Sequence, residues 1–332
     1  LKKLMSKQLM NRLHELKAAR NSMTKPTLFV TNDDGVDAPG IQHLIRELNI
    51  HEYPLIVLAP ATEQSATGMR ISVRKKLKVT KRQDITDNLQ INKKIPLKVY
   101  SLDGSPCDCV IVALDGGLSM LEPDFKPSMC ISGVNQGPNL SVDIMHSGTV
   151  SAARESALYG MPSIAISLAT YEHSDFEDSV KGAIKIIESC LNFLPVNPPD
   201  LLRQNGSESL PELSSNADSL REHFSHGNIF LNLNAPLKWN GHFNTVSLGS
   251  RWYRSAITSH QIEMGGLAFE VGAAEIIEEE IPQTDCFSVN SGEYAISPIS
   301  SWPVNHPLGM PKSILDAAAI SDSQGLPFWF SS

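Results

Sequence analysis

The sequence lacks paired cysteines and long apolar runs. Its five cysteines, Cys107, Cys109, Cys130, Cys190 and Cys286, are scattered and include no CxxC pair. This pattern indicates neither a disulfide framework nor a zinc site, and it predicts reduced thiols in the cytoplasm. No stretch approaches the roughly 18 consecutive apolar residues that a transmembrane helix needs, so we expect a protein that does not cross a membrane.

Positive charge is also scarce. The chain of 332 residues has 28 Lys or Arg against 36 Asp or Glu, which gives a formal net charge of -8. Affinity for long nucleic acid comes mainly from basic side chains that neutralise phosphates, so this balance argues against a DNA- or RNA-binding protein. A small phosphorylated ligand needs only a local positive site and is compatible with the composition.

Two segments differ from the rest of the chain. Residues 1–25 hold seven Lys or Arg and one acidic residue, Glu15, with leucines at near-helical spacing. We interpret them as a basic N-terminal extension, and an organelle-targeting segment is the alternative because such segments are basic, amphipathic and poor in acids. Residues 195–226 are rich in Pro, Ser, Asn and Glu, which predicts a flexible insertion.

Short apolar runs alternate with amphipathic stretches from residue 26 to residue 194. Strands are expected at 27–30, 55–59, 97–102, 129–131 and 163–168, and helices at 41–48, 107–114, 150–159 and 175–193. The alternation predicts an α/β domain with a mostly parallel sheet, because crossover helices join parallel strands. Further strands are expected at 228–234, 244–248 and 294–299, within a C-terminal region of residues 227–300 that precedes a tail at 301–332.

Two adjacent carboxylates follow the first expected strand. The run 27–30 ends in Thr31-Asn32-Asp33-Asp34-Gly35, and ligands of open α/β sheets bind beyond the carboxyl ends of strands. Carboxylate oxygens are the ligands that Mg²⁺ or Mn²⁺ prefers. The structural alternative is that Asp33 and Asp34 form an Asx turn while Asp37 caps the helix that follows. Taken alone, the triplet favours this alternative slightly.

Three more loops follow expected strands. They are residues 60–68 with Ser65, residues 132–139 with Asn135, and the step Ser147-Gly148-Thr149 into the helix at 150–159. Free N–H groups and the positive dipole end at a helix start can hold a phosphate, although Ser and Thr are also ordinary N-caps. Because carboxylates, amides and a helix start all fall at strand carboxyl ends, the pattern favours a binding site.

These motifs resemble those of the SurE (survival protein) nucleotidase family. The matching segments are, in order, Thr31-Asn32-Asp33-Asp34-Gly35, Pro60 to Ser65, Asp103-Gly104-Ser105-Pro106-Cys107-Asp108-Cys109, Ser132-Gly133-Val134-Asn135 with Gly137-Pro138-Asn139, and Ser147-Gly148-Thr149-Val150 through Arg154-Glu155. Five motifs in the right order make the resemblance specific. It covers residues 26–170 and resumes more weakly at Thr284-Asp285 and 294–299. It does not extend to residues 1–25 or 195–226.

The resemblance implies a fold, an activity and a set of site residues. The fold is a Rossmann-like three-layer α/β sandwich with a C-terminal β-hairpin exchanged between subunits, hence a homodimer or homotetramer. The activity is divalent-metal-dependent release of phosphate from nucleoside 5′- and 3′-monophosphates, with one Mg or Mn ion per subunit. The implied metal ligands are Asp33, Asp34, Ser65 and Asn135, of which the two aspartates are catalytic, and the implied phosphate contacts are Asn139, Ser147, Gly148 and Thr149.

Two residues depart from the family pattern. His146 stands where the family usually has Tyr, and Ser156 replaces a frequent Gly, so we expect both to tune the pocket. His146 is either a group near the phosphate or an ordinary packed histidine. The chain has no GxxxxGK[ST], no GxGxxG after a strand and no GxSxG motif. The open alternatives are a hydrolase of polyphosphate or another phosphoester, and a non-catalytic nucleotide-binding assembly protein.

Overall fold

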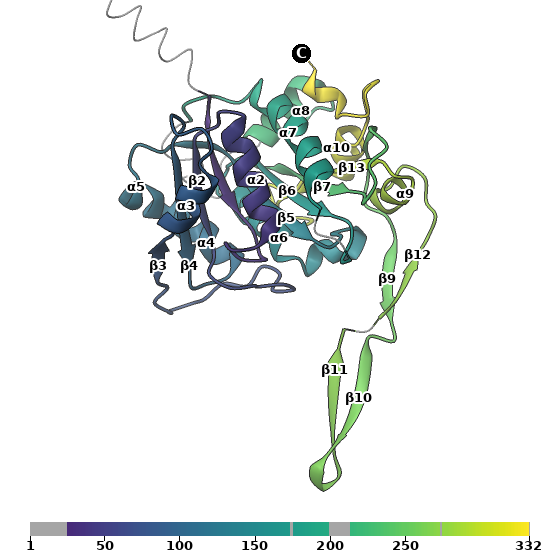
Figure 1. Cartoon of the computed structure of the whole chain (residues 1–332). Coiled ribbons are helices and arrows are strands. Elements are labelled where there is room, and N and C mark those ends of the chain that lie inside the picture. Colours follow the sequence, from purple (N-terminus) through teal and green to yellow (C-terminus); the bar gives the residue numbers. More distant parts are fainter. Residues whose placement is uncertain (1–24, 173–174, 199–212, 273, 332) are drawn as a thin grey trace, which may run out of the picture.

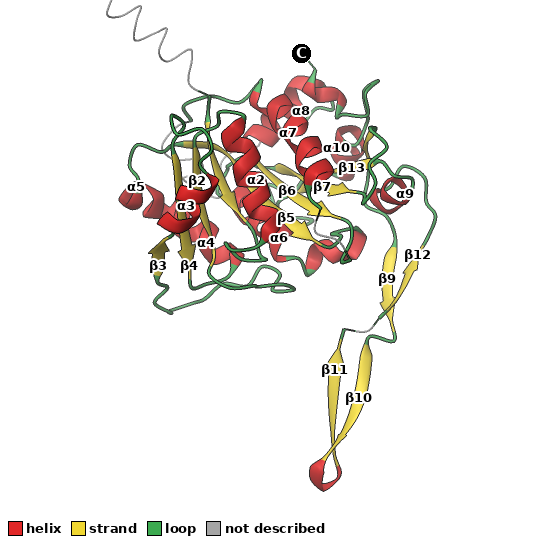
Figure 2. Ribbon diagram, viewed as in Figure 1, coloured by secondary structure: helices red, strands yellow, loops and turns green. Residues whose placement is uncertain are grey.

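A nine-stranded sheet forms the centre of the protein (Figures 1 and 2). The computed structural model describes residues 25–172, 175–198, 213–272 and 274–331. The strand order is β3-β4-β2-β1-β5-β6-β7-β13-β8. The strands are β1 (Thr27–Thr31), β2 (Leu55–Pro60), β3 (Val79–Lys81), β4 (Leu97–Leu102), β5 (Pro127–Gln136), β6 (Ser163–Leu168), β7 (Ile229–Ala235), β8 (Phe243–Thr245) and β13 (Tyr294–Ser300). Every neighbouring pair from β4 through β7 is parallel, whereas β3 and β13 are antiparallel to β4 and β7.

Helices cover both faces of this sheet. They are α2 (Pro39–Ile50), α3 (Gln83–Leu89), α4 (Pro106–Val112), α5 (Leu118–Leu121), α6 (Gly148–Leu158), α7 (Glu177–Leu191), α8 (Ala217–Ser225), α9 (Asp285–Asn290) and α10 (Lys312–Ala318). Leu28 and Val30 of β1 pack in the core cluster that includes α2 and α7, and Phe29 packs in the cluster that includes α4 and α6. Successive side chains of a strand point to opposite faces, so a strand buried on both faces is an unbroken apolar run. The predicted three-layer α/β sandwich is confirmed.

The segment that we predicted as a flexible insertion contains an ordered helix. Helix α8 buries Leu220 and Phe224, and the Phe224 ring centroid lies 5.7 Å from that of Trp329 and 6.0 Å from that of Phe193. The prediction is wrong for residues 217–225. It rested on the polar composition of the whole segment, which hides a short amphipathic helix. Residues 199–212 of the predicted insertion and residues 1–24 of the basic extension lie outside the described residues.

The C-terminal residues complete the core of the same sheet. Strand β7 pairs with β6 and with β13, so the boundary near residue 194 does not separate two sheets. The tail from residue 301 contributes α10 and the fully buried Trp329, whose indole N–H donates to the Ala318 carbonyl at 3.1 Å. All five cysteines are free and buried. Among the described helices, none has both the length and the apolar composition needed to cross a membrane.

A two-part β-arm projects from the body of the protein (Figure 1). Strand β9 (Arg251–Arg254) pairs with β12 (Glu275–Glu278) at its root, and β10 (Ile257–Ile262) pairs with β11 (Gly266–Val271) further out. Its apolar side chains are largely exposed, for example Leu267 at 62% and Val271 at 77%. The resemblance predicted a C-terminal hairpin, and antiparallel hairpins are present.

Replacing Phe224 with alanine tests whether α8 belongs to the core. Phe224→Ala is expected to lower the free energy of unfolding by about 3–5 kcal/mol, because it empties a buried aromatic site. Chemical unfolding curves measure this, with the exposed Glu222→Ala on the same helix as the control. A loss no larger than that of the control would contradict the packing of α8.

Candidate functional site

A cavity of about 410 Å³ lies beyond the carboxyl ends of β1 and β5. Five of the eight predicted site residues line it, namely Asp33, Ser65, Asn135, Asn139 and Ser147. The other three, Asp34, Gly148 and Thr149, lie next to these rather than among the lining residues. The sheet therefore brings together loops that are far apart in the sequence, as the motifs predicted.

Asp33 is a buried carboxylate held by the start of α6. The Thr149 hydroxyl donates to Asp33 Oδ1. Burial raises the pKa of Asp33, while hydrogen bonds from the Thr149 hydroxyl and from the backbone of Thr149 and Gly148 lower it. A Cβ atom on Gly148 would lie 2.7 Å from the Asp33 Cβ, so only glycine allows the helix to approach this closely. Thr149, predicted to contact phosphate, donates its hydroxyl hydrogen to Asp33 and holds this carboxylate in place.

Asp34 is tied to a different element. Its Oδ2 accepts a hydrogen bond from the Gln136 N–H at 3.1 Å, at the end of β5. Burial, then the charge of Asp33 and then that of Glu63, raise the pKa of Asp34 to about 7, and the hydrogen bond from Gln136 opposes them. Gly35, with φ of +95°, lets the chain turn directly after the pair. The two neighbouring carboxylates are thus held by different elements, Asp33 by α6 and Asp34 by β5.

The structural alternative for the aspartates is wrong. Asp33 and Asp34 bond to α6 and β5 rather than closing a local Asx turn. Asp37 does not cap α2, whose N-cap is Ala38 with no side-chain hydrogen bond. The Asp37 carboxylate instead accepts two hydrogen bonds from the Arg82 guanidinium, at 2.8 and 2.7 Å.

A bulge in β5 turns Asn135 toward the site. Ser132 pairs with Ala165 of β6 and Asn135 pairs with Ser167, so β5 has one residue more than β6 between these positions. The extra residue places Asn135 on the face that Ser132 occupies, although three positions separate them. Asn135 Nδ2 donates to the Gly137 carbonyl at 2.9 Å, which leaves its Oδ1 free of that bond.

The donor set fits a hard divalent cation. It consists of two carboxylates, the exposed Ser65 hydroxyl, which donates to Glu63 at 2.9 Å, and the Asn135 amide oxygen. Within the described residues no three His, Cys, Asp or Glu side chains form a metal cluster. The proposed set has two carboxylates, and its other two donors are a hydroxyl and an amide oxygen. Oxygen donors suit Mg²⁺ or Mn²⁺ rather than a softer metal. Two adjacent carboxylates with raised pKa values also favour a nearby positive charge.

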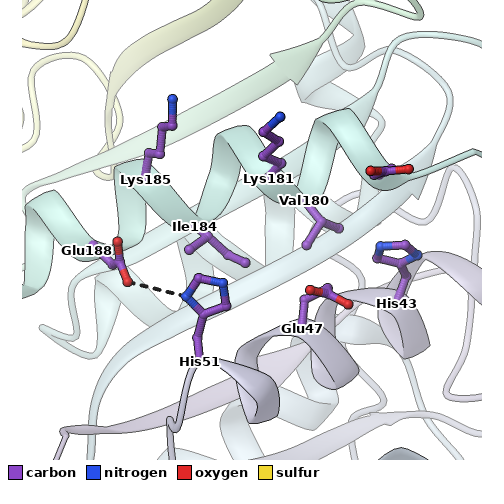
Figure 3. Close-up of a pocket in the computed structure, with 9 residues that line it drawn as sticks. His43, Glu47, His51, Val180, Lys181, Ile184, Lys185 and Glu188 are labelled. Atoms are coloured by element: carbon purple, nitrogen blue, oxygen red, sulfur yellow. Dashed lines mark ion pairs between the residues drawn. The ribbon is translucent and has the colours of Figure 1, made fainter.

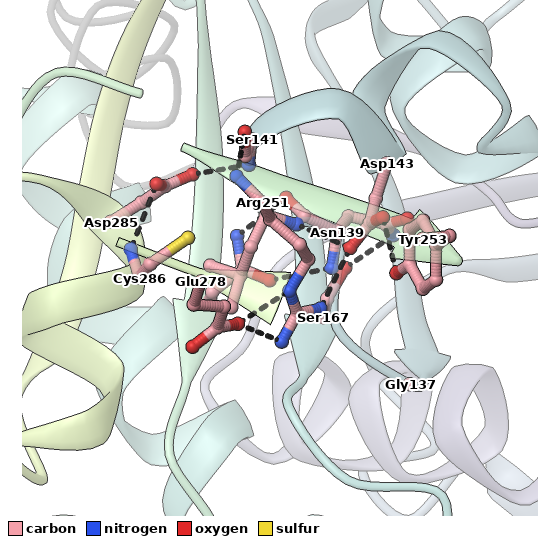
Figure 4. Close-up of polar contacts among 12 residues, drawn as sticks. Gly137, Asn139, Ser141, Asp143, Ser167, Arg251, Tyr253, Glu278, Asp285 and Cys286 are labelled. Atoms are coloured by element: carbon pink, nitrogen blue, oxygen red, sulfur yellow. Dashed lines mark hydrogen bonds and ion pairs between the residues drawn. The ribbon is translucent and has the colours of Figure 1, made fainter. Parts of the chain in front are cut away.

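The side chains of Ser147 and Asn139 differ in how many hydrogen-bonding atoms they have left for a ligand. The Ser147 hydroxyl caps α6 by accepting from the Val150 N–H at 3.0 Å, which leaves its hydrogen free for donation to an anion. The Asn139 side chain donates to the Ser167 hydroxyl at 2.7 Å. The Asn139 backbone is held by the side chains of two asparagines of β7, Asn232 and Asn234, and Asn139 is labelled in Figure 4.

Other residues that line the cavity were not predicted as site residues. Tyr171 and Tyr253 line it together with Asp143, and Asp143 accepts hydrogen bonds from the Tyr253 hydroxyl at 2.6 Å and from Arg251 at 2.9 Å (Figure 4). Arg251 and Tyr253 are two positions apart on β9, and the period of a strand places them on one face. That spacing was the available signal, but residues 251–254 were not predicted as a strand. His146 also lines the cavity and is exposed, so it is not a packed core histidine.

Two other cavities contain none of the predicted site residues. One of about 580 Å³ lies between α2 and α7, where His51 Nδ1 is 3.5 Å from Glu188 Oε1 (Figure 3). The other, of about 950 Å³, is a mostly apolar groove beside the β13–α10 segment. The candidate site is therefore the cavity of about 410 Å³ at the carboxyl ends of the strands, the smallest of these three.

Comparison with known proteins identifies the family. Residues 28–261 match the family model of the survival protein SurE. The 5′-nucleotidase SurE of Natranaerobius thermophilus is 31% identical over 277 residues, which cover 82% of this chain and 92% of that protein. The 5′-nucleotidase SurE of Thermosipho africanus is 42% identical over 161 residues, 48% of this chain and 57% of that protein. The crystal structure of the SurE protein from Aquifex aeolicus superposes with a TM-score of 0.60 at 26% identity and covers 84% of this chain and 95% of that one. The family predicted from five motifs is confirmed, and the chain belongs to the SurE family.

Proposed function

We propose that this protein is a divalent-metal-dependent phosphomonoesterase that releases phosphate from nucleoside 5′-monophosphates, and from 3′-monophosphates as a second substrate class. The observation that carries the proposal is the buried Asp33 carboxylate at a cavity that also presents Ser65, Asn135 and Ser147. Relatives that cover most of the chain bear the name 5′-nucleotidase SurE.

Four oxygen-bearing side chains would hold the cation in this proposal, those of Asp33, Asp34, Ser65 and Asn135. A bound Mg²⁺ or Mn²⁺ would supply positive charge that stabilises the transferring phosphoryl group. The protein supplies the fixed geometry, because Asp33 is held by α6 and Asp34 by the end of β5.

The start of α6 would stabilise the phosphate. The Ser147 hydroxyl has a hydrogen left to donate, and the amides at a helix N-terminus favour an anion. Thr149 acts as a positioning residue, since its hydroxyl is already given to Asp33. Asn139 would act mainly by fixing the loop after β5, because its side chain donates to Ser167.

We propose further that the β-arm pairs with a second copy of the chain to give a homodimer or homotetramer. Exposed apolar side chains along β10 and β11 support this, including Ile257, Leu267 and Phe269, each at least 59% exposed. An isolated two-stranded hairpin is marginally stable in water, so partner contacts would stabilise the arm.

A substrate panel separates this proposal from its rivals. We expect the purified protein to release phosphate from nucleoside monophosphates, to lose that activity in EDTA and to regain it in excess Mg²⁺ or Mn²⁺. Colorimetric detection of phosphate measures the rates. Release from polyphosphate alone would favour the other hydrolase, and binding of nucleotide without any release would favour the non-catalytic alternative.

Asp34→Asn tests the electrostatic account of the site. A carboxyl group whose pKa rises on folding holds its proton more tightly in the folded chain, so folding stability falls as the pH rises from its ordinary pKa of 3.8 to about 7. Asparagine does not ionise. In EDTA at pH 8 the variant should therefore exceed the wild type in free energy of unfolding by roughly 1–2 kcal/mol, with a smaller gain at pH 5.

Urea unfolding curves at pH 5 and pH 8, with and without Mn²⁺, measure the pH dependence of stability and the stabilisation by the metal. Mn²⁺ should stabilise the wild type and leave Asp34→Asn unchanged, because a ligand stabilises only the state that binds it. The exposed Asp124→Asn is the matched control and should behave as wild type. An Asp34→Asn variant that is less stable than the wild type at pH 8 in EDTA would refute the account.

A further inference from the structure

The two ends of the site cavity differ in chemistry. One end carries the carboxylate, hydroxyl and amide groups described above. The other end is lined by two tyrosines, Tyr171 and Tyr253, and by small or apolar residues at the base of the arm, among them Ala256 and Val271. A nucleoside monophosphate has the same division, since a charged phosphate is joined through a sugar to a flat ring system.

Tyr171 is an exposed aromatic residue with a supported ring. The residue is 66% exposed, so the ring is accessible to a ligand in the cavity that it lines. The ring packs against Gly137, where an added Cβ would lie 2.4 Å from Tyr171 Cε1. The Tyr171 carbonyl accepts from Gln136 Nε2 at 3.2 Å. The loop after β5 thus supports the ring at the cavity edge.

Tyr253 is fixed from the other side. Its hydroxyl donates to Asp143 Oδ1 at 2.6 Å, and Arg251 bonds both Asp143 and Glu278, at 2.9 and 2.5 Å (Figure 4). Asp143 lies in the turn Ser141–Met145, directly before His146 and Ser147. One carboxylate therefore holds both the ring of Tyr253 and the turn that leads to the phosphate end of the cavity.

We infer that Tyr171 and Tyr253 form the nucleobase subsite of this cavity and determine its preference for nucleotides over other phosphomonoesters. The inference rests on the proposed function. It adds that the nucleobase of the substrate lies at the arm root. Every nucleobase has a π face, so stacking on aromatic rings favours nucleotides as a class without selecting one base. Rings already held by Gly137 and Asp143 lose little conformational freedom on binding.

Steady-state kinetics on substrates with and without a nucleobase test the inference. The probes are AMP and ribose 5-phosphate, which share the sugar and the phosphate ester. We expect the wild type to have a KM for AMP about tenfold or more below that for ribose 5-phosphate, from the usual strength of base–aromatic stacking. Tyr171→Ala should raise the KM for AMP about tenfold, leave the KM for ribose 5-phosphate unchanged, and change kcat for either by less than about twofold.

Two further variants make the result specific. Tyr171→Phe keeps the ring and should retain the preference for AMP. Glu172→Ala changes the exposed neighbour, which does not line the cavity, and should behave as wild type. Tyr253→Phe should keep most of the preference, because the ring stays and only the bond to Asp143 is lost, whereas Tyr253→Ala should lose it.

The outcomes separate the inference from the proposed function. If Tyr171→Ala raises the KM for both substrates equally, or for neither, the inference is overturned while the nucleotidase activity stands. If the wild type releases no phosphate from either substrate, the proposed function fails. Calorimetric Kd values for AMP and ribose 5-phosphate then decide the subsite, since the inference requires tighter binding of AMP by the wild type and not by Tyr171→Ala.

Discussion

The contact between the start of α6 and the buried Asp33 carboxylate is the constraint on which the site depends. Burying an ionised carboxylate costs several kcal/mol unless hydrogen bonds or opposite charges compensate. Thr149 and the first amides of α6 compensate Asp33, and Gly148 permits the close approach. Asp34, beside it, has one backbone donor, and its pKa rises to about 7. The protein thus holds a negative centre that its own groups neutralise only in part.

The base of the arm and the candidate site share one polar network (Figure 4). The Ser141 N–H donates to Asp285 at 2.9 Å, and the Gly249 N–H donates to the same carboxylate at 2.6 Å. Arg251 extends the network to Asp143, and both side chains are about nine-tenths buried. Charged groups this far from water are costly to separate, so this ion pair holds the arm root against the turn before α6. In an assembly joined through the arms, subunit contacts would therefore bear on the geometry of the site.

The sequence predicted the sheet and the family better than it predicted the contacts. Strands β1 and β2 contain unbroken apolar runs, at 28–30 and 55–60, because both of their faces are buried, and such runs are visible without a structure. The role of Asp33 and Asp34 was undecided, because their partners Thr149 and Gln136 are 116 and 102 residues away. No local pattern separates a turn aspartate from one held by a distant helix.

The parts that were missed lack a periodic signal for a physical reason. Strand β10 is exposed at every position, so it has none of the alternation that burial of one face produces. The core partner of α8, Trp329, is more than 100 residues beyond the helix. Tyr171 lies on a loop and Tyr253 lies on the arm. A single aromatic residue in such a segment forms no recognisable sequence motif. These contacts exist only once the sheet has assembled.

The central claim is that Asp33 and Asp34 form half of a cation site, and a calorimetric titration of the EDTA-treated protein with Mn²⁺ tests it most directly. The account predicts one Mn²⁺ per subunit for the wild type, loss of binding in Asp33→Asn, and weakened binding in Thr149→Val with recovery in Thr149→Ser. Unchanged Mn²⁺ binding by Asp33→Asn, or no binding by a folded wild type, would contradict it.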